Sequence, residues 1–169
     1  KTLLEHAGNL QAHYYKARAC FDLLEFGEAL EEFVKTLRLD PNHAEAHYYA
    51  ARSLYGLSRF DEAVHEFEIA ENLNATNAPA FYYHARACMR LERQNEAIRI
   101  FDSCLALTPR DALAHFYRGR ALTTLGRYRE AVESFESALE SDVSCADAAF
   151  WRSEALRNLG RYDESLAAA

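Results

Sequence analysis

Arginine and aromatic residues recur along this chain at a spacing that suits recognition of anionic and apolar groups. The segment HYYKARAC begins at residue 13, and related segments begin at residues 47, 81, 115 and 149, always 34 residues apart. In the first four copies an arginine follows the second aromatic residue by three positions. A guanidinium can donate two parallel hydrogen bonds to a carboxylate, and it can stack on an aromatic ring. These residues therefore favour binding chemistry over catalysis.

The familiar motifs of catalysis and metal binding are absent. The sequence contains no glycine-rich phosphate loop, no HExxH or GxSxG motif and no CxxC pair. His13, His47 and His115 recur at one repeat position, but stacked helices lie about 8 to 10 Å apart, too far for zinc bonds of about 2 Å. We therefore predict no enzyme activity, no cofactor and no metal site. Three cysteines are interpreted as packing residues: Cys20, Cys88 and Cys104.

The 34-residue interval defines a unit of two predicted helices. Each unit has about 13 helix-favouring residues, a short break such as LGRY at 125–128, and about 13 more. Pro41 and Pro109 fall where a second helix must end, because proline has no backbone N–H to donate. One repeat position marks the turn inside each unit, occupied by Leu24, Ser58, Glu92, Gly126 and Gly160. The predicted units are 10–43, 44–77, 78–111, 112–145 and a partial 146–169, and residues 1–9 are predicted to end a second helix of a preceding unit.

This pattern resembles the tetratricopeptide repeat, which reads W-x2-L-G-x2-Y, then A-x3-F, then P over about 34 residues. The A-x3-F element recurs at Ala29 and Phe33, Ala63 and Phe67, Ala97 and Phe101, and Ala131 and Phe135. The consensus proline is missing at Ala75 and Val143. The resemblance implies an all-α fold, a right-handed α-solenoid of stacked antiparallel helix pairs, forming a single domain over residues 1–169.

One face of each first helix collects the aromatic residues and the arginines. With the unit numbered from 1 and about 100° per residue, positions 12, 5, 9, 2, 13 and 6 share one arc. In the family that the chain resembles, this arc lines a concave groove. The resemblance thus implies partner-binding residues at positions 5, 6, 9 and 13, which are Tyr14, Arg18, Tyr48, Tyr49, Arg52, Tyr82, Tyr83, Arg86, Arg90, Phe116, Tyr117 and Arg120.

Acidic neighbours divide these arginines into two classes. Arg18 has Asp22 one turn later and Glu45 at position 2 of the next first helix. Arg120 has Asp147 at position 2 of its next first helix. No such acid is visible beside three other arginines, which are Arg52, Arg86 and Arg90. We expect these three to contact the acidic or carboxylate groups of a partner. A tyrosine four residues before an arginine can also hold it by a cation–π contact, so a purely structural role stays open.

Charge supports a protein partner. The first helices hold nine Lys or Arg against four Asp or Glu, a net of +5, whereas the whole chain is −7 and the remainder therefore −12. A groove positive relative to its surroundings attracts acidic segments. We predict a protein–protein interaction scaffold that binds a peptide segment. The alternatives are self-association or an intramolecular structural module, and single-stranded nucleic-acid binding, against which the acidic pI of about 5.5 argues.

The remaining features concern location and the chain ends. No apolar run reaches the roughly 18 to 20 residues that span a bilayer, so no membrane role is predicted. Four cysteines without a disulfide pattern favour an intracellular and cytoplasmic location. Because the chain starts at Lys1 and stops inside a unit, we expect a piece of a longer protein. Uncapped ends of this kind expose apolar surface that a second copy or a further helix would cover.

Overall fold

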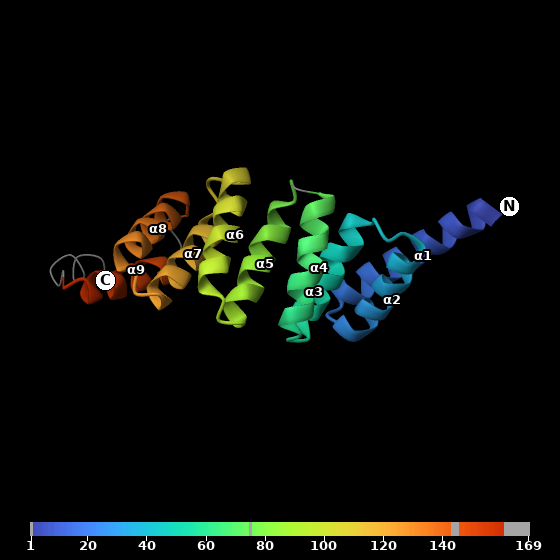
Figure 1. Ribbon diagram of the computed structural model, residues 1–169, viewed down its shortest axis with the longest axis horizontal. Helices are drawn as coiled ribbons and strands as arrows, with labels where there is room; N and C mark the ends of the chain where they lie inside the picture. The colour runs from blue at the N-terminus through green and yellow to red at the C-terminus, as the bar shows by residue number, and fades with distance from the viewer. Residues whose placement is uncertain (1, 75, 143–145, 161–169) are drawn as a thin grey trace. The chain divides into compact units, whose positions relative to one another are not determined.

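The computed structural model describes residues 2–74, 76–142 and 146–160, with side chains described from residue 8 onward. Within these ranges the chain forms nine α-helices and no strand (Figure 1). The helices are α1 Thr2–Asp22, α2 Phe26–Leu39, α3 Ala44–Gly56, α4 Phe60–Leu73, α5 Ala78–Arg90, α6 Gln94–Leu107, α7 Ala112–Thr124, α8 Tyr128–Ser141 and α9 Ala146–Asn158. The predicted all-α fold of helix pairs is confirmed.

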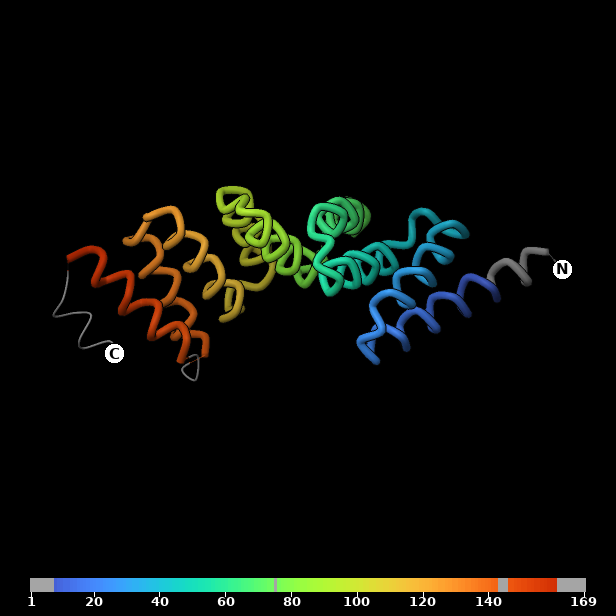
Figure 2. Tube along the Cα trace, turned by 90° about the horizontal axis from the view of Figure 1, so that it is seen from below, coloured from blue at the N-terminus to red at the C-terminus, as the bar shows by residue number. Residues whose placement is uncertain are grey.

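The chain divides into two compact units, which are larger than the 34-residue repeat units and comprise residues 1–87 and 88–169. Within each unit consecutive helices pack side by side, as α1 and α2 do in the first and α8 and α9 in the second (Figure 2). First helices of neighbouring pairs also touch, α1 against α3 and α7 against α9. The single domain predicted for residues 1–169 stays a prediction. Among the described residues, no helix has both the length and the apolar character needed to cross a bilayer.

Helix starts and ends follow the repeat. Helices α3, α5, α7 and α9 begin at residues 44, 78, 112 and 146, the predicted unit starts. Asp111 caps α7, since its side chain accepts a hydrogen bond from the Ala114 N–H at 3.0 Å. Helices α2 and α6 end two residues before Pro41 and Pro109, and α4 ends at Leu73 without a proline. The positions of the missing prolines, 75 and 143, and the predicted last second helix lie outside the described residues.

The turn inside each pair adopts the left-handed backbone conformation. The five predicted turn residues have positive φ angles, namely Leu24 at 63°, Ser58 and Glu92 at 60°, Gly126 at 72° and Gly160 at 74°. The N–H of Glu25 donates to the carbonyl of Cys20 at 2.9 Å, and that of Leu24 to the carbonyl of Phe21 at 3.0 Å. This pair of bonds satisfies the last carbonyls of the first helix and reverses the chain.

The start of the chain differs from the prediction. Residues 1–9 were expected to end a separate second helix, but α1 continues without a break from Thr2 to Asp22. Gly8 and Asn9 are weak helix formers, yet they cost only about 1 kcal/mol each in a helix interior. Without a proline or a positive φ angle at this point, the helix does not end.

The core of each pair is built from one phenylalanine against small residues. Phe33, Phe67, Phe101 and Phe135 are fully buried. Position 8 of the facing first helix is small, and Ala17, Ala51 and Ala85 are fully buried there. In the fourth pair this position is Gly119, where an added Cβ would lie 2.6 Å from the ring of Phe135. The small residue thus sets how closely the two helices of a pair approach.

Candidate functional site

The repeated arginines lie against aromatic rings of the following first helix. The Arg18 guanidinium carbon is 3.8 Å from the centroid of the Tyr49 ring, and that of Arg52 is 4.3 Å from the Tyr83 ring. Within residues 88–169, the Arg120 guanidinium carbon is 4.6 Å from the centroid of the Trp151 ring. All six side chains are half-buried. We call these six residues the arginine–aromatic surface. It has one part within residues 1–87, made of Arg18, Tyr49, Arg52 and Tyr83, and one part within residues 88–169, made of Arg120 and Trp151.

Sequence reasoning predicted the residue types on this face but missed these contacts. It considered a ring four residues earlier in the same helix, whereas the stacked ring comes from the next first helix. The signal is a 31-residue spacing, from position 9 of one unit to position 6 of the next. Stacking on a ring orients a guanidinium and leaves its N–H edge open.

Three of the position-5 aromatic residues lie deeper than expected. Tyr14 and Tyr48 are 8% and 7% exposed, and Phe116 is 6% exposed. The hydroxyls of Tyr14 and Tyr48 each accept from the Nη1 of the arginine four residues later at 3.4 Å. Burial is the main reason that the pKa of each of these tyrosines is raised to about 12. These rings therefore pack beneath the arginines, and their contact with a partner stays a prediction.

The predicted acid partners of two arginines are wrong. Glu45 accepts a hydrogen bond from the Tyr14 hydroxyl at 2.6 Å and not from Arg18. In the part of the chain that the structure describes, Arg18 forms no ion pair, and its buried Nε has no hydrogen-bond partner. Asp22 acts on Arg18 only through its charge. Arg120 likewise forms no described ion pair with Asp147, because its guanidinium lies on Trp151.

The remaining predicted residues fall in different environments. Arg52 donates to the hydroxyls of Tyr48 at 3.4 Å and Tyr83 at 3.2 Å, and the described residues offer it no carboxylate, as predicted. Arg86 contacts the Tyr82 hydroxyl at 3.5 Å, and Arg90 is exposed at the end of α5. Tyr117 is half-buried and packs edge-on against Phe116, with ring centroids 5.0 Å apart.

Two of the recurring histidines pair with acids of the second helix. The Nδ1 atoms of His13 and His47 each lie 2.6 Å from a carboxylate oxygen, of Glu32 and Glu66 respectively. The Nε2 atom of His47 lies 2.9 Å from the Pro41 carbonyl oxygen. Burial acts to lower the pKa of His47, but the bonds to Glu66 and Pro41 outweigh it, so the pKa is raised.

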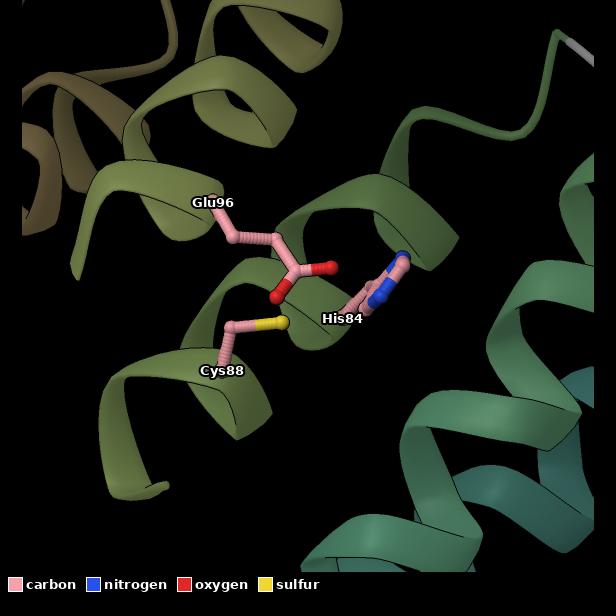
Figure 3. A group of neighbouring side chains, drawn as sticks. All are labelled: His84, Cys88 and Glu96. Carbon is pink, nitrogen blue, oxygen red and sulfur yellow. The ribbon is translucent and has the colours of Figure 1, made fainter. Parts of the chain in front are cut away.

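A further polar group surrounds Cys88 (Figure 3). His84 and Cys88 lie on consecutive turns of α5, and Glu96 lies in the first turn of α6. A ring nitrogen, the Cys88 sulfur and a Glu96 carboxylate oxygen all lie within 4.8 Å of one another. The sequence predicted a packing role for Cys88, because it replaces a small or apolar core residue at position 11. The available signal was the H-x3-C spacing, which places both side chains on one face of a helix.

Family models agree with the repeat. A tetratricopeptide repeat model matches residues 82–128 and 118–169, and a second tetratricopeptide repeat model matches residues 10–43. A model of the anaphase-promoting complex, cyclosome, subunit 3 matches residues 33–104. No curated protein matches the chain.

Solved structures share the fold. The MamA protein is similar with a TM-score of 0.92 and 19% identity, over 96% of this chain and 88% of MamA. MamA from Desulfovibrio magneticus RS-1 is similar with a TM-score of 0.89 and 17% identity, over 95% of this chain and 90% of that MamA chain. YrrB, a TPR protein with an unusual peptide-binding site, is similar with a TM-score of 0.83 and 25% identity, over 92% of this chain and 80% of YrrB.

Proposed function

Since the chain belongs to the tetratricopeptide repeat family, we propose that it is a protein-interaction scaffold that binds a peptide segment of another protein along its first helices. The arginine–aromatic surface forms the contact. A partner's apolar side chains pack on the rings at position 6, and its carboxylates or backbone carbonyls accept from the arginines at position 9.

One observation carries this proposal, namely that stacking leaves the guanidinium edges unfilled. A guanidinium has five N–H donors. Arg52 donates two of them to phenol oxygens. The Arg120 guanidinium lies over the Trp151 ring, and the residue four positions before Arg120 is Phe116, which has no hydroxyl to accept a hydrogen bond. A half-buried cation held against a ring loses little conformational freedom on binding, which favours affinity.

The spacing of the helices suits an extended ligand. Neighbouring packed helices lie about 8 to 10 Å apart, and an extended chain advances about 3.3 Å per residue. A bound segment therefore meets one arginine about every third residue. YrrB, at 25% identity, has a peptide-binding site, and this similarity supports a peptide as the ligand class.

A random peptide library displayed on phage tests the proposal directly. We expect the chain to enrich peptides in which acidic residues alternate with aromatic or aliphatic ones. Tyr15, another position-6 ring, is 65% exposed and contributes little to the core. Tyr15→Ala should lower the affinity for the best peptide roughly tenfold or more, as loss of an interface aromatic residue does. The circular dichroism spectrum should stay unchanged.

The matched control replaces an arginine away from this surface. Arg59 lies in the α3–α4 turn, exposed and paired with Glu62 at 2.6 Å. Arg59→Gln should change peptide affinity less than about twofold, as for a peripheral charge, whereas Arg52→Gln should weaken it about tenfold. Failure to enrich any peptide, or equal losses for Arg59→Gln and Arg52→Gln, would contradict the proposal.

A further inference from the structure

His84 is a buried histidine with only one of its two ring nitrogens engaged. Its side chain is 4% exposed, and its ring stacks on Phe67 with an interplanar angle of 16°. Nδ1 lies 2.9 Å from a carboxylate oxygen of Glu71, whereas the buried Nε2 has no hydrogen-bond partner. A buried polar atom without a partner costs about 1 to 3 kcal/mol, so native proteins seldom leave one unfilled.

Glu96 brings a negative charge next to His84 and Cys88. Its side chain is half-buried, and its carboxylate has no hydrogen bond or ion pair among the residues that the structure describes. Figure 3 shows this carboxylate between the Cys88 sulfur and the His84 ring. A cation would balance the charge of a carboxylate that shares one partly dry space with a thiol and an imidazole.

We propose that His84, Cys88 and Glu96 bind a divalent transition-metal ion of the zinc class. Nitrogen, sulfur and carboxylate oxygen are the three ligand types that zinc accepts, at about 2.0 to 2.3 Å. Three atoms within 4.8 Å of one another share a point no more than about 2.8 Å from each, so small side-chain rotations complete the bonds. Three protein ligands leave the fourth position to water.

Glu71 fits this site as a positioning residue. Metal-ligating histidines usually place their other ring nitrogen against a carboxylate, which fixes the ring orientation. The Glu71–His84 contact has this arrangement. The sequence also sets this unit apart, because position 7 is Lys16, Ala50, Arg118 and Arg152 in the other units. Only residues 78–111 combine a histidine at position 7 with a cysteine at position 11.

Cobalt(II) titration of the metal-free chain tests the site. Cobalt bound by a thiolate gives a near-ultraviolet charge-transfer band, and low coordination number gives intense visible bands. We expect both bands to saturate at one cobalt per chain and to disappear when zinc is added. Zinc should also raise the melting temperature, because it binds the folded state.

Variants assign the ligands. Cys88→Ser should abolish the charge-transfer band. Glu96→Gln should lower the affinity for zinc at least tenfold, and Glu71→Gln should lower it about 10- to 100-fold. The matched control is Cys104→Ser, another fully buried cysteine outside this group, which should keep the band.

Glu96→Gln decides the matter even if Cys88→Ser does not fold, because Glu96 is only half-buried. Absence of a charge-transfer band in the wild type, a band that Cys104→Ser rather than Cys88→Ser removes, or unchanged zinc affinity in folded Glu96→Gln would each overturn the proposal.

Discussion

Single positions of the repeat combine packing with exposed chemistry. The ring of Tyr83 lies 4.3 Å from the Arg52 guanidinium, so the arginine joins α3 to α5 while part of its N–H edge remains open. Cation–π contacts of this kind contribute about 0.5 to 1 kcal/mol when exposed and more when desolvated. Packing and binding are therefore compatible in one side chain, and neither role excludes the other.

Gly119 is a position at which a single added methyl group would meet a fully buried ring. In Gly119→Ala the new Cβ would lie 2.6 Å from the fully buried ring of Phe135, and the two helices must separate. We expect a loss of about 1 to 3 kcal/mol in the free energy of unfolding. Urea denaturation measures it. Gly27→Ala, in the first turn of α2, is the control, since nothing lies within 4 Å of its new Cβ, and it should stabilise by at most about 0.5 kcal/mol.

The His47–Glu66 pair predicts a pH-dependent stability. Because the pKa of His47 is raised in the folded state, its contribution is full below the ordinary value of 6.5 and is lost as pH rises through the folded value. Glu66→Gln should lower the melting temperature most in mildly acidic solution, and the difference from wild type should narrow as pH rises. His65→Gln, at an exposed histidine, should show no such trend. A difference that widens with pH would contradict this assignment.

At the scale of the helix pair, the turn residue limits stability. Leu24, Ser58 and Glu92 hold positive φ angles of 60° to 63°, at which a residue with a side chain costs roughly 1 kcal/mol relative to glycine. Leu24 is 70% exposed, so replacing it loses little packing. Leu24→Gly should raise the free energy of unfolding by up to about 1 kcal/mol.

The reciprocal change serves as the control for the turn. Gly126 has the same role, with a φ angle of 72° and nothing within 4 Å of a new Cβ. Gly126→Ala should therefore destabilise by a similar amount, through backbone strain alone. Chemical denaturation of both variants decides the matter, and a loss of stability in Leu24→Gly would show that its side chain matters more than its backbone.

At the scale of the whole molecule, each helix pair depends mainly on its neighbours. Repeat arrays behave this way because contacts do not extend beyond adjacent units. Phe33→Ala removes a fully buried ring from the first pair and should cost about 3 to 5 kcal/mol locally. We expect hydrogen exchange to accelerate in α1, α2 and α3 while α7 and α8 keep their protection. Equal acceleration throughout would indicate a single cooperative unit.

Features that depend on local chemistry and on the repeat period could be predicted from the sequence. The 34-residue interval defined the helix starts at 44, 78, 112 and 146, and it marked all five turn residues with positive φ. These follow from the sequence because capping and turn geometry involve residues only a few positions apart. The continuation of α1 through Gly8 was missed, since no local signal outweighed the assumed repeat boundary.

The partner of each polar group depends on how the helices pack and could not be predicted from the sequence. Glu45 could reach Arg18 or Tyr14, and its choice of the Tyr14 hydroxyl depends on how α1 and α3 pack. The stacking of Arg18 on Tyr49 and the meeting of Glu96 with Cys88 are likewise contacts between helices. Such contacts depend on helix separation and side-chain rotation, and the spacing of residues along the chain specifies neither.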